Sequence, residues 1–265
     1  MPDDLEPVEP IVPRDSSTVI VLRESAGVLE VFMLERHIQS DFAGGAYVFP
    51  GGTVDAADRD PVLASLVDGW EELAARTGED PDLARALAVC AIRETFEEAG
   101  ILLARHEDGS SVRLDDPGWN EKRRALANRE IDAVTLAKET GIRYAADLLR
   151  FWQRWVTPVF APRRYDTRFF VAVMPAGQTP LHDDVETTDS TWVQPTDAIA
   201  RGRSGQLVII FPTRKTLESL EGLETTTAVF DAAAGRTTMP ILPRFVVEDG
   251  VGHVYLPGDP NPHEP

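Results

Sequence analysis

The spacing of apolar residues predicts several short strands along the chain. Val19–Leu22 is a short apolar run, rich in β-branched residues, and predicts a central strand. Leu29–Glu35 follows a Ser-Ala-Gly turn and is expected to be its hairpin partner. Further strands are predicted at Ala46–Phe49 and Phe169–Met174, and another begins at Trp192. These segments are separated by turns and by segments with helical periodicity.

The clearest predicted helix runs from Pro81 to Ala99. Asp80 is typical of an N-cap, and proline at the first helical position is compatible with it. An apolar run over Leu83–Ile92 continues without a breaker, and Gly100 is expected to end the helix as a C′ glycine.

Other segments also carry helical spacing. Apolar residues between Leu63 and Leu73 predict one extra helix, and residues 118–154 predict two or three short helices with a stop at Gly141. Helices are further expected at Thr213–Leu220 and at residues 225–234, before a terminal hairpin within 241–256.

Three carboxylates gather on the last turns of the predicted helix. Glu94, Glu97 and Glu98 stand at i, i+3 and i+4, so their side chains share one face. Hard cations such as Mg²⁺ or Mn²⁺ bind such oxygen-rich clusters, and Arg93 can brace Glu97 four residues later. The alternative is a solvated charge run on an outer helix face.

A second segment of the sequence favours a metal or ligand site over a solvated charge run. Tyr47-Val48-Phe49 leads into Gly51-Gly52, which is predicted to be a turn where the backbone can approach a ligand closely. Together, Gly52 and the run Arg-Glu-Thr-Phe-Glu-Glu-Ala-Gly-Ile from Arg93 resemble the Nudix hydrolase signature, G-x5-E-x7-R-E-U-x-E-E-x-G-U, where U is a bulky apolar residue.

The spacing inside this signature departs from the family pattern. Between Gly52 and Arg93 the chain is about 27 residues longer, so the early glutamate has no certain match, and Asp55, Asp58 and Asp82 are candidates. A long insert here, with Phe-Pro-Gly-Gly-Thr-Val-Asp-Ala-Ala-Asp before it, resembles the branch related to coenzyme A diphosphatases. The insert could be a lid, a dimer contact or an elaboration.

The resemblance implies a fold, an activity and site residues. The implied fold is the Nudix α/β/α sandwich, with a mixed, curved sheet and additional helical insertions. The implied activity is metal-dependent cleavage of the diphosphate linkage in a nucleoside diphosphate derivative, such as coenzyme A or an acyl-coenzyme A. The implied metal ligands are Glu94, Glu97 and Glu98 with Mg²⁺ or Mn²⁺. The catalytic candidates are Glu97, Glu94, Arg93 and, from the loop before the Trp192 strand, Glu186, with Asp189 second.

Several alternatives stay open. The substrate could instead be ADP-ribose, NADH or another dinucleotide, and the fold could serve a non-catalytic nucleotide-binding regulator. Glu186 could equally belong to an ordinary acidic loop. The substrate-binding candidates are Gly51, Gly52 and the arginines Arg163, Arg164 and Arg168, because arginine forks match phosphate oxygens. Those arginines could also pair with surplus acidic residues.

Composition narrows the class of partner. The net charge of −18 argues against nucleic-acid and anionic-membrane binding, but not against a small phosphorylated substrate. Apolar runs such as Leu207–Phe211 are far too short to span a bilayer, and the acidic N-terminus is unlike a secretory signal, so a cytoplasmic location is expected. A homodimer is among the oligomeric states left open.

The predicted organisation is one domain with appendages. Residues 1–15 are expected to be a flexible arm, and residues 16–222 the Nudix domain, with a helical insert at about 56–80 and a helical segment at about 118–154. Residues 223–265 would be an extension that packs on the same domain.

Overall fold

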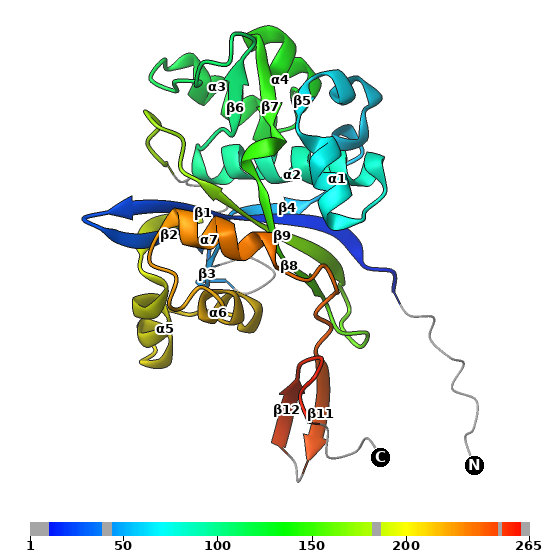
Figure 1. The fold of residues 1–265 in the computed structure, drawn as a ribbon, viewed down its shortest axis with the longest axis vertical. Helices are drawn as coiled ribbons and strands as arrows, with labels where there is room; N and C mark the ends of the chain where they lie inside the picture. The colour runs from blue at the N-terminus through cyan, green and yellow to red at the C-terminus, as the bar shows by residue number, and fades with distance from the viewer. Residues whose placement is uncertain (1–10, 39–43, 182–186, 249–250, 261–265) are drawn as a thin grey trace.

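A mixed sheet lies at the centre of the computed structural model (Figure 1), which describes residues 11–38, 44–181, 187–248 and 251–260. Its seven strands are β1 (Arg14–Ser25), β2 (Val28–Arg36), β3 (Tyr47–Val48), β4 (Gly51–Thr53), β8 (Arg150–Val156), β9 (Tyr165–Val173) and β10 (Thr187–Val193). The order is β10-β2-β1-β9-β8, with β3 on β2 and β4 on β1. The pair β1–β9 is parallel and the others are antiparallel, so the predicted mixed sheet is confirmed.

Helices cover both faces of this sheet. Along β1, Val19 and Val21 pack into one apolar core with α2 (Pro81–Ala99), while Ile20 and Leu22 pack into a second core on the opposite face. This alternation follows from the two-residue period of a strand. The second face is covered by three helices, α5 (Pro195–Arg203), α6 (Phe211–Glu218) and α7 (Thr226–Ala234). The result is the predicted α/β/α sandwich.

The first hairpin forms where the sequence predicts it. β1 and β2 pair antiparallel, and Ser25 lies opposite Val28 across the turn. The strand begins earlier than expected, because Arg14 and Asp15 already pair with Tyr165 and Asp166 of β9. The predicted arm of residues 1–15 therefore includes two residues that belong to the sheet.

The prediction of a single helix in the insert is wrong. The chain forms two 3₁₀ turns, a two-residue strand and a short helix: η1 (Ala57–Arg59), η2 (Pro61–Ser65), β5 (Val67–Asp68) and α1 (Trp70–Thr77). Gly69 separates β5 from α1, with φ of 78° and no room for a Cβ beside Asp147. The buried residues Leu63, Val67 and Leu73 come from η2, β5 and α1 in turn, so their spacing is near-helical without a continuous helix.

Residues 118–154 are helical only in their first half. This part of the chain forms α3 (Gly118–Ala127) and α4 (Ala133–Thr140), and Gly141 ends α4 in the left-handed region as predicted. The rest forms β7 (Ile142–Ala145), η3 (Ala146–Leu148) and then β8. β7 pairs with β5 of the insert and with β6 (Ala104–His106), so both additions share a small three-stranded sheet above the main one (Figure 1).

The C-terminal residues contribute to the core and then leave it. Val229 and Ala233 of α7 are buried in the same core as Ile20 of β1. β11 (Arg244–Glu248) and β12 (Val251–Tyr255) form the predicted hairpin, which projects away from the sandwich (Figure 1). The division at residue 222 stays a prediction. Among the described residues, no helix combines the length and the apolar character needed to cross a membrane.

Candidate active site

The helix α2 is built by the local signals that predict it. The Asp80 side chain accepts hydrogen bonds from the backbone N–H groups of Asp82 and Leu83, at 3.0 and 3.2 Å. Gly100 follows the last turn with φ of 63°, a conformation that glycine adopts at little cost. The helix therefore holds Arg93, Glu94, Glu97 and Glu98 on its last two turns, as expected from the sequence.

The glycine pair lies against these carboxylates, but not in a turn. Gly51 and Gly52 form most of β4, which pairs antiparallel with β1, and neither has a positive φ. Their role is close approach: the Gly51 N–H donates to Glu98 Oε2 at 2.9 Å, and a Cβ on Gly52 would lie 2.3 Å from Glu94 Oε1. The predicted turn is therefore wrong, because these residues form a strand. Glycine is still needed at both positions, because a Cβ would overlap neighbouring atoms.

Arg93 is held by a carboxylate that the sequence left undecided. Its Nε and Nη2 atoms donate to the two oxygens of Asp58, both at 2.9 Å, and the Asp58 side chain is fully buried. Burial by itself would lower the pKa of Arg93, but the hydrogen bonds from Asp58 and the charges of Glu94 and Asp58 raise it above its ordinary value. The guanidinium is therefore a permanent cation.

Asp58 is the candidate that the geometry selects from the three early acidic residues. Asp82 lies at the other end of α2, where it pairs with Arg85, and Asp55 is 4.0 Å from Arg93. The sequence contains a signal for this choice: Asp58 stands six positions after Gly52, the spacing of G-x5-E. The extra residues of the insert therefore follow Asp58.

Arg93 also contacts the metal-ligand candidates. Its Nη1 atom lies 2.8 Å from Glu94 Oε1 and 3.3 Å from Glu97 Oε2. Burial raises the pKa of Glu97 to about 7, Arg93 opposes this shift, and the charge of Glu94 adds to it. The cluster thus carries more negative charge than one arginine can offset.

This surplus is suited to a divalent cation. The donor set consists of carboxylate oxygens, which Mg²⁺ and Mn²⁺ prefer. Because Gly51 and Gly52 have no side chains, the backbone of β4 packs directly against Glu94 and Glu98. In the described part of the chain, no three His, Cys, Asp or Glu side chains already converge in the arrangement of a formed metal site. Glu94 and Glu97 both lie against Arg93, which holds their carboxylates at the end of α2.

A cavity of about 450 Å³ opens beside Arg93 and Glu97. Its walls come from the start of the insert and from the region between α3 and α4. The wall residues are Asp55, Ala56, Ala57, Asp58, Leu126, Arg129, Glu130, Ile131, Asp132, Ala133 and Thr135. The two additions to the sandwich therefore build the space beside Arg93 and Glu97, which the sequence does not predict.

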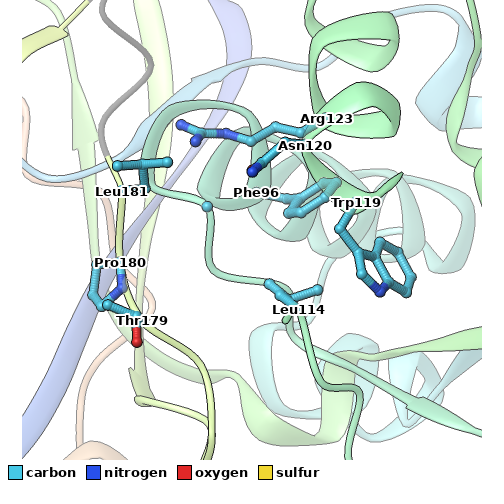
Figure 2. Close-up of a pocket in the computed structure, with 9 residues that line it drawn as sticks. Phe96, Leu114, Trp119, Asn120, Arg123, Thr179, Pro180 and Leu181 are labelled. Atoms are coloured by element: carbon cyan, nitrogen blue, oxygen red, sulfur yellow. The ribbon is translucent and has the colours of Figure 1, made fainter. Parts of the chain in front are cut away.

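A smaller cavity of about 200 Å³ lies at the end of α2 (Figure 2). Phe96 and Trp119 form one wall with their rings edge to face, and Leu181 faces them from another segment. Arg123 donates from Nε to the Glu97 carbonyl at 2.8 Å, which places a cation at the negative end of the helix. None of the α2 carboxylates lines this cavity.

Arg164 and Arg168, two of the three arginines near β9, contact groups other than the α2 carboxylates. Arg168 is 2% exposed, and its guanidinium lies 2.8 Å from both Asp15 and Glu79 and 3.4 Å from Asp166. Arg164 is buried and donates to the carbonyls of Ile11 and Thr157. Pairing with acidic residues, the alternative interpretation, is thus observed for Arg168. Arg163 is exposed. Substrate contact by these arginines stays a prediction.

Two further candidates for catalysis come from the segment before Trp192. Glu186 lies outside the described residues. The second candidate, Asp189, lies in β10 and accepts a hydrogen bond from the Tyr47 hydroxyl at 3.4 Å.

Comparison with known proteins places this chain in a family. A family model described as the NUDT19 Nudix domain matches residues 79–218. Acyl-coenzyme A diphosphatase NUDT19 of Xenopus laevis is 26% identical over 280 residues, covering 87% of this chain and 70% of the relative. The Gallus gallus protein of the same name is 30% identical over 223 residues, covering 69% and 58%.

A solved structure agrees with the fold. The crystal structure of a Nudix hydrolase from Alicyclobacillus acidocaldarius superimposes with a TM-score of 0.69 at 30% identity. The match covers 86% of this chain and 99% of that one.

Proposed function

This chain belongs to the family of Nudix hydrolases that the NUDT19 Nudix domain describes, and we propose that it cleaves the diphosphate linkage of coenzyme A or an acyl-coenzyme A. The enzyme is a pyrophosphohydrolase. The site assignment rests on one observation. Glu94 and Glu98 pack against Gly52 and Gly51, and the buried Asp58 holds the Arg93 side chain beside these carboxylates. The name of the relatives from Xenopus and Gallus supports the substrate.

The proposed reaction is the attack of water on one phosphorus of the diphosphate. A new P–O bond forms, and the bond to the bridging oxygen breaks. With coenzyme A, the products would be 4′-phosphopantetheine and adenosine 3′,5′-bisphosphate. A divalent cation, held by Glu94, Glu97 and Glu98, would supply charge neutralisation on the phosphoryl oxygens and a lowered pKa for its bound water.

We propose a distinct role for each of Glu97, Arg93 and Asp58. Glu97 is the proposed acceptor of the proton of the attacking water at its carboxylate, because it lines the larger cavity beside Arg93. Arg93 holds Glu94 and Glu97 in place and adds positive charge near the phosphoryl oxygens. Asp58 acts through Arg93, since its oxygens are used by that guanidinium.

The substrate proposal is tested by product release from a panel of compounds with Mg²⁺ and with Mn²⁺. The panel holds coenzyme A, acetyl-coenzyme A, NADH, ADP-ribose and nucleoside triphosphates. Turnover of the two coenzyme A compounds with release of adenosine 3′,5′-bisphosphate is the expected result. Turnover of NADH or ADP-ribose alone would keep the hydrolase and replace the substrate. Binding without turnover of any compound would favour a regulator.

Replacing Gly52 by alanine is expected to lower kcat/KM by about 10²-fold, because a Cβ at this position overlaps the Glu94 carboxylate and must displace it by about an ångström. The measurement is steady-state kinetics with Mg²⁺. Gly235→Ala is the matched control, since its Cβ would meet nothing closer than 3.8 Å and its φ is −93°. Equal activity in both variants would show that the close packing of β4 on α2 is irrelevant to catalysis.

The stability of the metal-free protein is expected to depend on Glu97. Its pKa is about 7 in the folded protein and 4.5 by its ordinary value, so folding favours the protonated form. The stabilising contribution is complete below pH 4.5 and is lost as pH rises to about 7. The loss amounts to about 1–3 kcal/mol, because the side chain is mostly buried.

Urea unfolding in EDTA at pH 5.5 and pH 8.0 measures this loss. Other carboxylates also titrate, so the informative quantity is the difference between wild type and Glu97→Gln. We expect the glutamine variant to be the more stable at pH 8.0, with the difference shrinking at pH 5.5. An identical pH dependence in the two proteins would contradict the raised pKa.

A further inference from the structure

Arg129 occupies a backbone conformation that glycine normally takes. It follows α3 with φ of 61°, and its N–H donates to Leu126 while that of Glu130 donates to Ala125. These two bonds form a Schellman motif, in which the C′ position favours glycine. Within the described residues, Ala26 is the other non-glycine residue with positive φ. Arginine at this position therefore costs backbone strain that glycine would avoid.

The Arg129 side chain is directed to the proposed active site. Its Nη2 atom lies 3.0 Å from Asp55 Oδ2, and Arg93 Nη2 lies 4.0 Å from the same oxygen. The two guanidinium nitrogens are therefore at most about 7.0 Å apart, the sum of these two distances. Both arginines line the larger cavity together with Glu97.

The two arginines differ in how strongly they are engaged. Arg93 is buried and lies within ion-pair distance of Asp58, Glu94 and Glu97. The Arg129 side chain is 76% exposed and forms an ion pair with Asp55, which is itself partly exposed. An exposed pair of this kind contributes little to stability, so an incoming phosphate can replace Asp55 at low cost. The guanidinium fork can then bind two phosphate oxygens.

We propose that Arg129 contacts a phosphate group of the substrate and exchanges Asp55 for it on binding. This inference rests on the proposed function and adds a substrate-binding residue to it. The phosphate has two sources in coenzyme A: the diphosphate itself and the 3′-phosphate of the ribose. Both present the same oxygen chemistry to arginine, so the experiment must separate them.

The test compares Arg129→Gly with wild type on coenzyme A and on 3′-dephospho-coenzyme A. We expect KM for coenzyme A to rise 10- to 100-fold, while the melting temperature stays equal to or above that of wild type, because glycine relieves the strain. Arg129→Lys is expected to recover part of the loss. A rise in KM for both compounds would assign the diphosphate, and a rise for coenzyme A alone the 3′-phosphate.

Ala26→Gly is the matched control, since it relieves the same strain in the β1–β2 turn, away from the cavity. It should leave KM unchanged. An unchanged KM of Arg129→Gly for both compounds would overturn the inference. If wild type turns over another panel compound instead, KM of Arg129→Gly is measured with that compound. An incorrect substrate proposal therefore does not by itself overturn the role of Arg129. If wild type turns over none, calorimetric titration with adenosine 3′,5′-bisphosphate is decisive: equal affinity in wild type and Arg129→Gly overturns the inference.

Discussion

Glu97→Gln is expected to lower kcat by about 10³-fold while the protein stays folded. Glutamine keeps the shape of the side chain but removes the negative charge and the capacity to accept a proton. Glu97 lines the larger cavity beside Arg93, so both losses occur where the phosphorus would lie. Steady-state and single-turnover rates with Mg²⁺ measure the effect.

A glutamate outside the site provides the control for this substitution. Glu139 of α4 pairs with Lys122 at 2.6 Å on the surface, so Glu139→Gln should keep full activity. Calorimetric titration with Mg²⁺ supplies a readout that does not depend on turnover, and the affinity should fall for Glu97→Gln alone. Full activity in Glu97→Gln would exclude this carboxylate from catalysis.

Asp58→Ala is expected to lower the free energy of unfolding by about 3–5 kcal/mol, the largest stability effect that we predict. Asp58 is fully buried and contributes both oxygens to Arg93, which is 7% exposed. Alanine would leave the guanidinium buried without its bidentate partner, and would also free Arg93 to move away from Glu94 and Glu97. Activity should therefore fall together with stability.

Asp55→Ala serves as the comparison in urea unfolding. Asp55 is three residues away, partly exposed, and pairs with the exposed Arg129, so its loss should cost no more than about 1 kcal/mol. Equal destabilisation by the two substitutions would contradict the assignment of Asp58 as the residue that positions Arg93.

The elements that the sequence predicts well are those defined by local signals. Asp80, Pro81 and Gly100 specify both ends of α2, and they do so within one turn of the residues concerned. The Ser-Ala-Gly turn similarly sets the register of β1 and β2. In such elements the neighbouring residues in the sequence are also the neighbours in space.

The incorrect predictions concern elements that depend on distant partners. Leu149 and Trp152 belong to a short, mostly apolar segment around Arg150, which periodicity cannot assign to a strand or a helix. The pairing of β8 with β9 makes this segment a strand, and Trp152 lies in β8 at the irregularity between Phe151 and Gln153. In the insert, Val67 lies in a strand because it pairs with Tyr144, which is 77 residues later in the chain.

The residues of the candidate site also differ in whether local sequence or distant packing determines their position. The carboxylates of α2 follow from the helical repeat, because all of them lie on one element. The partner of Arg93 comes from a 3₁₀ turn 35 residues away, and only the spacing after Gly52 points to it. Arg129 carries no motif in the sequence, because its proximity to Arg93 arises from the packing of α3 and α4 beside the insert.

The central claim is that the end of α2 holds the cation and the diphosphate. The most direct measurement is an anomalous difference map from crystals of the full chain grown with Mn²⁺ and adenosine 3′,5′-bisphosphate. We predict a manganese peak within coordination distance of Glu94, Glu97 and Glu98. A peak at another place, or no peak at saturating Mn²⁺, would contradict the account.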